Sequence, residues 1–107
     1  MSERRRHPRV RVSLYIDWGP TDECARQARI TSLSVGGCFV QTEDAAQFEQ
    51  TVFLRFSAPD PLVVRTQVRY HMPGVGFGVM FDELPIETRL TLEDLVAHYQ
   101  QQPTAKT

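Results

Sequence analysis

The sequence has only two cysteines among its 107 residues, and it has no long apolar run. No stretch approaches the roughly 20 apolar residues that a membrane-spanning helix needs, so we expect no membrane insertion. The arginines near the N-terminus precede no apolar segment, so they do not form a secretory signal. Cys24 and Cys38 lack CxxC spacing and have too few partners for a zinc site, which favours a reduced, cytoplasmic protein. Cys38 lies within an apolar run and is expected to be a small core residue.

Catalytic motifs are missing as well. The sequence contains no nucleophile elbow, and its three histidines stand alone without a paired metal ligand. Gly74, Gly76 and Gly78 are spaced like a phosphate loop, but no helix follows them, so the dinucleotide-binding fingerprint fails. We expect these glycines to relieve crowding between strands instead. The sequence therefore predicts no catalytic residue, no metal site and no enzyme.

Arginine, by contrast, is concentrated at one end of the chain. Residues 1–11 carry five arginines against the single acid Glu3, a local charge of +4. The other 96 residues carry seven cations and twelve anions, a net charge of −5. Arginine outnumbers lysine by eleven to one, which favours planar, bidentate recognition over a diffuse positive field. Residues 1–9 lack apolar periodicity, and we predict that they form a flexible arginine-rich arm.

Beyond the arm, apolar residues alternate with a period of two, which is typical of half-buried strands. In the longest segment, Leu62, Val64, Thr66, Val68 and Tyr70 are predicted to share one face. Residues 43–48 fit either one helical turn or a loop. Turns are predicted at residues 19–22, 59–61 and 72–74. The predicted strands cover residues 10–18, 24–31, 38–40, 51–56, 62–71 and 75–81.

The apolar period changes after Pro85. Leu92, Leu95, Val96 and Tyr99 recur at helical spacing, which predicts a helix over residues 86–101. We expect this stripe to pack on the strands, with the pairing of two chains into a weak homodimer as the alternative to a monomer. Residues 10–101 would then form one mainly β domain, a small antiparallel barrel with a helix packed across it. Residues 102–107 form a polar tail that we predict to be disordered.

The turn at residues 32–37 is the second feature with chemical potential. Its sequence, Ser-Leu-Ser-Val-Gly-Gly, can offer hydroxyl acceptors and free backbone N–H groups. Combined with arginine forks, it suits a ligand that carries both guanine and phosphate. However, an arginine-rich terminus is also typical of a solvated or nucleic-acid-binding segment, and such a turn can be purely structural. From these residues alone, a nucleotide site, a solvated or nucleic-acid-binding arm and a purely structural turn all remain open.

The order of these features resembles the PilZ domain family. Its RxxxR motif corresponds to Arg5-Arg6-His7-Pro8-Arg9, its [D/N]xSxxG turn to residues 32–37, and its last barrel strand to residues 76–81. The resemblance spans residues 3–100, nearly the whole chain. It implies a six-stranded antiparallel β-barrel with a C-terminal α-helix, and binding of the bacterial second messenger cyclic di-GMP.

The resemblance also implies a set of ligand-binding residues. Arg5 and Arg9 would contact guanine and phosphate, and Arg6 would be an auxiliary phosphate contact. Arg4, immediately before RxxxR, resembles members of the family that bind an intercalated pair of ligand molecules. Ser34 matches the motif serine, and Gly37 would let the turn pass close to the ligand. The complete set is Arg4, Arg5, Arg6, Arg9, Ser32, Ser34, Gly36 and Gly37.

Ser32 departs from the family pattern, because the motif has an acid or amide at this position. A serine hydroxyl accepts a hydrogen bond from guanine more weakly than a carboxylate does. The deficit is about 1–2 kcal/mol, or about ten- to thirty-fold in affinity, which weakens binding without abolishing it.

Two functional hypotheses follow from the resemblance. In the first, the protein is a cyclic di-GMP receptor whose arm folds over the ligand and which regulates a partner protein in trans. Motility, exopolysaccharide or secretion machinery would be the partner. In the second, it is a degenerate PilZ adaptor that acts through protein contacts without binding the nucleotide. Nonspecific nucleic-acid binding is disfavoured, since the net charge of −5 outside the arm argues against a broad basic groove.

Overall fold

The computed structural model describes residues 9–57 and 61–101, in which six strands precede one helix. The predicted order of elements is confirmed, although β2 begins at Arg26 rather than Cys24, and residues 43–48 form a loop rather than a helical turn. Predictions for the arm before Arg9 and for the tail after Gln101 lie outside the described residues. The elements are β1 (Val10–Gly19), β2 (Arg26–Leu33), β3 (Gly37–Gln41), β4 (Thr51–Phe56), β5 (Leu62–Met72), β6 (Gly76–Phe81) and α1 (Ile86–Gln101).

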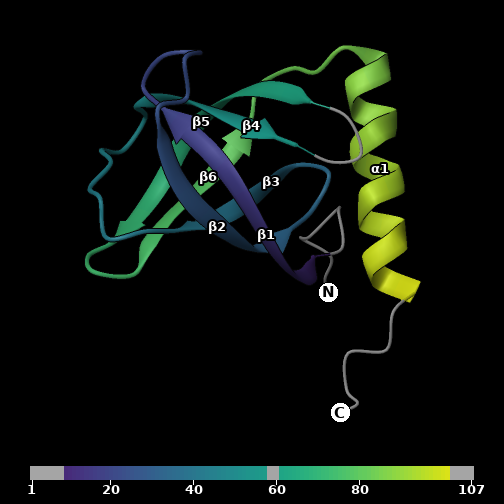
Figure 1. Cartoon of the computed structure of the whole chain (residues 1–107), viewed down its shortest axis with the longest axis horizontal. Coiled ribbons are helices and arrows are strands. Elements are labelled where there is room, and N and C mark those ends of the chain that lie inside the picture. The colour runs from purple at the N-terminus through teal and green to yellow at the C-terminus, as the bar shows by residue number, and fades with distance from the viewer. Residues whose placement is uncertain (1–8, 58–60, 102–107) are drawn as a thin grey trace, which may run out of the picture.

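The six strands form a closed antiparallel barrel in the order β1-β2-β3-β6-β5-β4. Pairing between β1 and β4 closes it, with Trp18 opposite Leu54. Closure leaves no unpaired sheet edge along this order. Figure 1 shows α1 standing along one side of the barrel. The predicted fold class, a mainly β barrel followed by a C-terminal helix, is therefore confirmed.

The barrel interior is filled by apolar side chains from every strand. Trp18 and Phe77 are fully buried and pack edge to face, with their ring centroids 5.0 Å apart. Thr66, also fully buried, donates its hydroxyl hydrogen to the carbonyl oxygen of Val52 at 3.0 Å, so it places no unsatisfied hydroxyl in the core. Cys38 is 1% exposed and belongs to the same core, as the sequence predicted.

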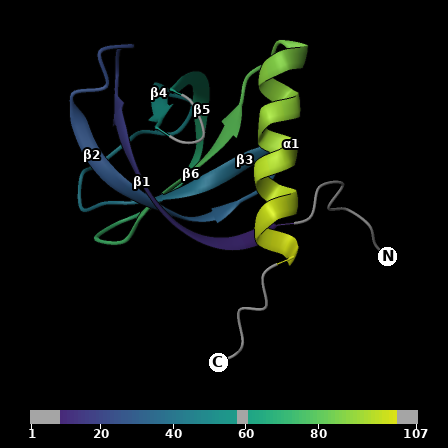
Figure 2. The same ribbon diagram turned by 45° about the vertical axis from the view of Figure 1, so that its right-hand side comes forward.

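Helix α1 packs on the barrel through the predicted stripe. Leu92 and Val96 are buried, and Leu95 and Tyr99 are partly buried against the core. In both ribbon views the start of β1 passes beside the C-terminal half of the helix (Figures 1 and 2). The stripe is thus occupied by the protein's own barrel. No helix in the described part of the chain is long and apolar enough to cross a membrane.

The prediction for β5 is wrong at Tyr70. This residue was expected to share the core face with Val68, but 45% of it is exposed. The ladder between β5 and β6 pairs Val68 with Val79 and then Tyr70 with Gly78, so Arg69 is an extra residue in a β-bulge. One extra residue reverses the faces of all residues beyond it, because side chains alternate strictly along a strand. The bulge therefore turns Tyr70 outward.

The glycines of β6 have the predicted packing role. A Cβ atom at Gly76 would overlap the carbonyl oxygen of Val40, and one at Gly78 would overlap the ring of Tyr70. At Gly76 backbone occupies the space of a side chain, so this position needs glycine, whereas at Gly78 the space is occupied by the ring of Tyr70. For Gly74 the prediction is wrong, because a Cβ atom there would meet nothing within 4 Å. This glycine lies in the turn and has a positive φ of 76°, a conformation that favours glycine.

Candidate ligand-binding face on the outside of the barrel

One row of residues across neighbouring strands brings an arginine, a serine and two aromatic side chains onto the same face of the barrel. Reading across neighbouring strands, Arg11 of β1 lies opposite Ser32 of β2, which lies opposite Phe39 of β3. Phe39 lies opposite Gly78 of β6, which lies opposite Tyr70 of β5. Residues that are opposite in a sheet project from the same face. We call this outward-facing set the Ser32 row.

Bulges place the row on the outer face. Between β2 and β3, Ile30 pairs with Val40 and Ser32 with Phe39, so Thr31 is an extra residue on β2. With strict alternation and no bulge, Ser32 would face inward, because it lies two residues after the fully buried Ile30. A second irregularity between Arg11 and Leu14 adjoins the same position from β1. Together with the Arg69 bulge, these irregularities aim Ser32 and Tyr70 outward, a common use of bulges beside binding sites.

Arg9 lies at one end of the row and contacts Ser32. Its Nη1 atom donates to the Ser32 hydroxyl oxygen at 3.4 Å, which is a long and therefore weak hydrogen bond. Arg9 and Arg11 are both exposed, and neither forms an ion pair with an acid among residues 9–57 and 61–101. Within the described part of the chain no acid neutralises these two guanidinium groups, and each has N–H groups that can donate to an anion or to a base edge.

Phe39 and Tyr70 form an aromatic surface at the other end. Their rings stack with centroids 6.1 Å apart and an interplanar angle of 27°. The missing side chain of Gly78 provides the space in which the Tyr70 ring lies. The Ser32 row therefore combines guanidinium donors, a hydroxyl and an exposed aromatic surface.

Ser34 has a structural role in the turn after β2. It is 5% exposed, and its hydroxyl oxygen accepts hydrogen bonds from the backbone N–H groups of Gly36 at 3.1 Å and Gly37 at 3.2 Å. Its hydroxyl hydrogen is donated to the Gly37 carbonyl oxygen at 3.3 Å. A hydroxyl has one donor and two acceptor sites, so all of its capacity is used within the turn. The Ser34 side chain therefore holds the turn, and its hydroxyl has no hydrogen-bonding capacity left for a ligand.

The two turn glycines tie the turn to β6. The carbonyl oxygen of Gly36 accepts a hydrogen bond from the Phe81 N–H at 2.9 Å. Gly37 is buried, and a Cβ atom there would overlap the carbonyl oxygen of Val79. Neither glycine has a positive φ. The requirement at position 37 is thus the close approach of β3 to β6, rather than an unusual backbone conformation.

The predicted site residues divide into three groups. Arg4, Arg5 and Arg6 lie outside the described residues. Arg9 and Ser32 lie together and share a hydrogen bond. The remaining predicted positions, Ser34, Gly36 and Gly37, form the turn that supports Ser32.

The sequence prediction missed Phe39 and Tyr70 as site residues. The Arg69 bulge, which no pattern in this sequence indicates, exposes Tyr70. Its partner Phe39 lies within an apolar run that resembled pure core. A usable signal did exist in the glycine at position 78, because a glycine within a strand often marks the close approach of a large neighbour.

Beneath the row lies the thiol of Cys38. Burial raises its pKa well above the ordinary value of 9.0, and the positive charge of Arg9 opposes this shift in part. A thiol that stays protonated is neither a nucleophile nor a metal ligand. Among the described residues there is no group of three or more His, Cys, Asp or Glu that could hold a metal ion.

A surface hollow elsewhere on the barrel is separate from the Ser32 row. It is lined by Tyr15, Ile16, Asp17, Gln27 and Ser57. The carboxylate of Asp17, at its wall, is paired with Arg55 at 3.1 Å. This lining includes neither Arg9 nor Ser32, so the hollow does not contain the contact between these two residues.

A closed six-stranded barrel with a C-terminal helix and a short turn after β2 defines the class of this domain. Residues 3–98 match the PilZ domain family, which is nearly the whole chain. The protein belongs to the PilZ domain family. No curated protein sequence matches it closely.

Solved structures share this fold at low sequence identity. The K. pneumonia MrkH–c-di-GMP complex superposes with a TM-score of 0.77 at 14% identity, over 99% of this chain and 57% of that chain. The PilZ domain of YcgR from Escherichia coli with c-di-GMP gives 0.75 at 12% identity, over 92% and 93%. The Bacillus subtilis inhibitor of motility, MotI/DgrA, gives 0.74 at 17% identity, over 92% and 52%. This chain thus spans about half the length of MotI/DgrA and MrkH, and the TM-scores show that all of these proteins share the fold.

Proposed function

We propose that this protein is a cyclic di-GMP receptor that binds its ligand on the Ser32 row. Membership of the PilZ family supports this, as do the similar structures of the MrkH–c-di-GMP complex and of the YcgR PilZ domain with c-di-GMP. The observation that carries the proposal is the contact between Arg9 and Ser32 on the same outer face as the Phe39–Tyr70 stack. The proposal includes Arg4, the residue immediately before RxxxR, which favours the binding of an intercalated pair of ligand molecules.

Each part of the row has a chemical role in this proposal. The guanidinium of Arg9 donates to a ligand phosphate or to guanine O6 and N7, and Arg11 adds a second positive charge beside it. The Ser32 hydroxyl accepts from a guanine N–H group. The exposed Tyr70 ring, supported by Phe39, offers a stacking surface, and stacking of a base on an aromatic ring is worth about 1–3 kcal/mol.

The N-terminal arginines complete the proposed site. Arg5 and Arg6 lie four and three residues before Arg9 in the chain, and we propose that this arm folds over the bound nucleotide. The ordered arm would then present a new surface to a partner protein. Hydrogen exchange of residues 1–9 measures this directly, since ordering slows exchange when ligand is added. Unchanged exchange with ligand bound would contradict the arm-ordering step alone.

Calorimetry with cyclic di-GMP tests the receptor proposal. We expect saturable binding by the native chain, weakened about ten-fold or more in Arg9→Ala, because a charge-assisted hydrogen bond contributes about 1.5–3 kcal/mol. Arg89→Ala is the matched control. It removes the same charge from α1, where Arg89 pairs with Glu93 at 3.4 Å, and should leave the affinity unchanged. Absence of binding heat, or equal affinity of the native chain and Arg9→Ala, would refute the proposal.

A second candidate function rests on Ser32. The family motif has an acid or amide here, and the loss of a charged acceptor favours an adaptor that acts through protein contacts without the nucleotide. Ser32→Asp distinguishes the two functions. For a receptor, this substitution tightens existing binding by about ten- to thirty-fold. If the native chain does not bind and Ser32→Asp does, the adaptor is correct.

A further inference from the structure

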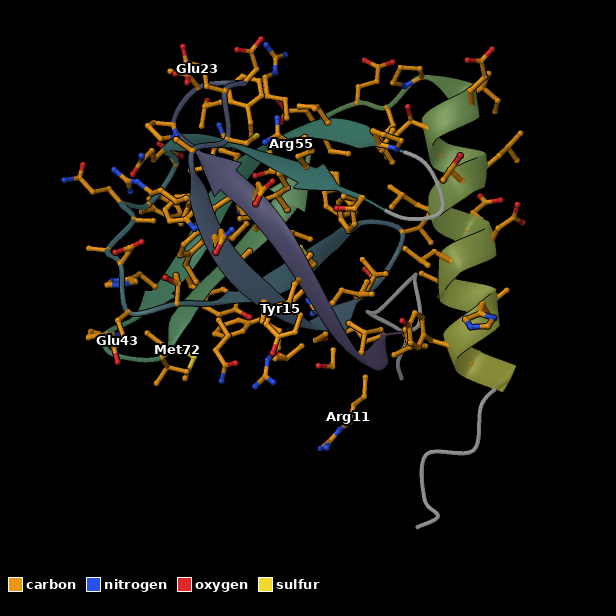
Figure 3. All side chains as sticks on the ribbon, in the orientation of Figure 1. Arg11, Tyr15, Glu23, Glu43, Arg55 and Met72 are labelled. Atoms are coloured by element: carbon orange, nitrogen blue, oxygen red, sulfur yellow. The ribbon has the colours of Figure 1, made fainter. Side chains whose placement is uncertain are left out.

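A second outward-facing row runs beside the Ser32 row. Across the strands, Tyr15 lies opposite Arg29, Arg29 opposite Gln41, Gln41 opposite Gly76, and Gly76 opposite Met72. We call it the Arg29 row. On β3, β5 and β6 its members are two residues from those of the Ser32 row, which corresponds to about 7 Å along a strand. Figure 3 shows Tyr15 and Met72 on the same side of the barrel as Arg11.

Arg29 and Gln41 form a fixed pair at the centre of this row. The Nε and Nη2 atoms of Arg29 both donate to the Gln41 side-chain oxygen, at 3.0 and 2.7 Å. Arginine can only donate hydrogen bonds, so the amide of Gln41 must direct its oxygen toward Arg29. The amide nitrogen of Gln41 and the Nη1 atom of Arg29 are then left to donate elsewhere. The pair therefore presents N–H donors and no acceptor.

The charge of Arg29 is not neutralised by the surrounding protein. Arg55, Arg65 and Arg89 each form an ion pair with an acidic side chain. Arg29 has no acidic partner within the described ranges, and Gln41 is a neutral acceptor. Two hydrogen bonds to one amide oxygen nevertheless hold the plane of its guanidinium. The guanidinium of Arg29 is thus held in one orientation while its charge is not neutralised by an acid. The fixed orientation reduces the conformational entropy that is lost when a ligand binds.

A large aromatic side chain stands next to this donor pair. Tyr15, opposite Arg29 on β1, is 77% exposed, the largest value among the exposed large hydrophobic side chains of the described chain. Solvation alone does not favour a bare ring at the middle of a strand. A phosphate group would satisfy the donors but would make no use of the ring. A planar base with acceptors on its edge would use both.

Guanine has the required edge, because its N7 and O6 atoms are both acceptors. Adenine presents N7 together with an N6 amino donor, which would face the donors of Arg29 and Gln41. The edge of guanine therefore matches a donor-only pair, and the edge of adenine places N–H against N–H. A base stacked on Tyr15 would bring this edge to the guanidinium plane.

We propose that Arg29 and Gln41 form a guanine-reading subsite, with Tyr15 as its stacking surface, for a base of the ligand bound on the Ser32 row. This inference rests on the proposed cyclic di-GMP binding and adds to it residues outside both PilZ motifs. It also provides this chain with charge-assisted donors that offset the weaker acceptor at Ser32. The subsite distinguishes guanine from adenine through the direction of its hydrogen bonds.

Substitutions at Arg29 test the subsite by calorimetry with cyclic di-GMP. Loss of a bidentate contact to guanine should weaken binding by about five- to one-hundred-fold in Arg29→Ala. Arg29→Lys keeps the charge but not the planar fork, and it should be weakened nearly as much. Arg89→Ala is again the control of equal charge. Full affinity in Arg29→Lys would mean that only charge matters, and would overturn the guanine-reading role.

Ligand chemistry provides a test that is independent of folding defects. The probe is cyclic di-GMP in which both N7 atoms are replaced by carbon, compared with the parent compound on the native chain and on Arg29→Ala. If Arg29 reads N7, the replacement costs more affinity in the native chain than in the variant. An equal cost in both overturns the subsite while leaving the receptor proposal intact. Failure of the native chain to bind the parent compound would refute both.

Tyr15→Ala and Gln41→Glu extend the test to the other two members. Tyr15→Ala removes the stacking surface and should weaken binding by about five- to one-hundred-fold. Gln41→Glu places a carboxylate against Arg29, which neutralises the guanidinium and removes the amide donor, so binding should weaken by at least as much as in Arg29→Ala. Native affinity in both variants, with Arg9→Ala still defective, would overturn the subsite and retain the Ser32 row.

Discussion

Replacement of Ser34 by alanine tests whether the motif serine holds the turn. Its hydroxyl makes three hydrogen bonds within residues 34–37, and no donor or acceptor capacity remains. A neutral hydrogen bond contributes about 1 kcal/mol net, and a buried N–H left without a partner costs about 1–3 kcal/mol. The turn keeps the bond from the Ser34 N–H to the Gly37 carbonyl oxygen at 2.8 Å, so its shape is not lost entirely. We therefore expect Ser34→Ala to lower the free energy of unfolding by about 2 kcal/mol.

Thermal and urea unfolding measure this loss. For a domain of this size, 1 kcal/mol corresponds to a shift in Tm of about 4–8 °C, so Ser34→Ala should unfold about 10 °C below the native chain. Ser13→Ala is the matched control, because Ser13 is exposed on β1 and has no side-chain hydrogen bond to the described residues. Its stability should stay within about 0.5 kcal/mol of the native value. If the two variants are equally stable, the hydroxyl of Ser34 does not hold the turn.

Two further predictions concern Gly37 and Cys38. Gly37→Ala places a Cβ atom against the backbone carbonyl of Val79, which cannot move without separating β3 from β6, so urea unfolding should show a loss of about 1–3 kcal/mol or more. Burial raises the pKa of the Cys38 thiol above 9.0, so the unfolded thiol ionises at a lower pH than the folded one, and stability present below pH 9.0 is lost above it. Urea unfolding across this range should show a decrease approaching about 1.4 kcal/mol per pH unit, part of which is absent in Cys38→Ala.

Each of these has a clear contrary outcome. Native stability in Gly37→Ala would mean that β3 and β6 can separate locally at no cost. The same pH dependence above 9.0 in the native chain and in Cys38→Ala would mean that ionisation of this thiol does not contribute. Burial raises the pKa of the Cys24 thiol as well. Cys24 lies in the loop before β2 rather than in the barrel core, so Cys38 is the residue to substitute in the pH experiment.

Much of the fold could be predicted because the local patterns agree with the global structure. The alternation in residues 10–18 matches β1 to within one residue, and the helical spacing after Pro85 matches the bounds of α1. Both patterns arise because each side chain of these elements points either into the single core or toward solvent, and apolar residues occupy the inward positions. Arg9 and Ser32 could also be selected as candidate site residues, because the segments that contain them resemble the two motifs of the PilZ family.

What the sequence alone determined is therefore the set of elements, the core and the presence of arginines and a serine–glycine turn. Which residues share the outer face was decided only by tertiary structure. The bulges at Thr31 and Arg69 reverse the faces of Ser32 and Tyr70, and they arise from pairing with strands that are distant in the chain. The same cross-strand registers place Tyr15, Arg29 and Gln41 in one row. Single-strand periodicity contains no information on register between strands, because register is set by contacts that form only when the barrel closes.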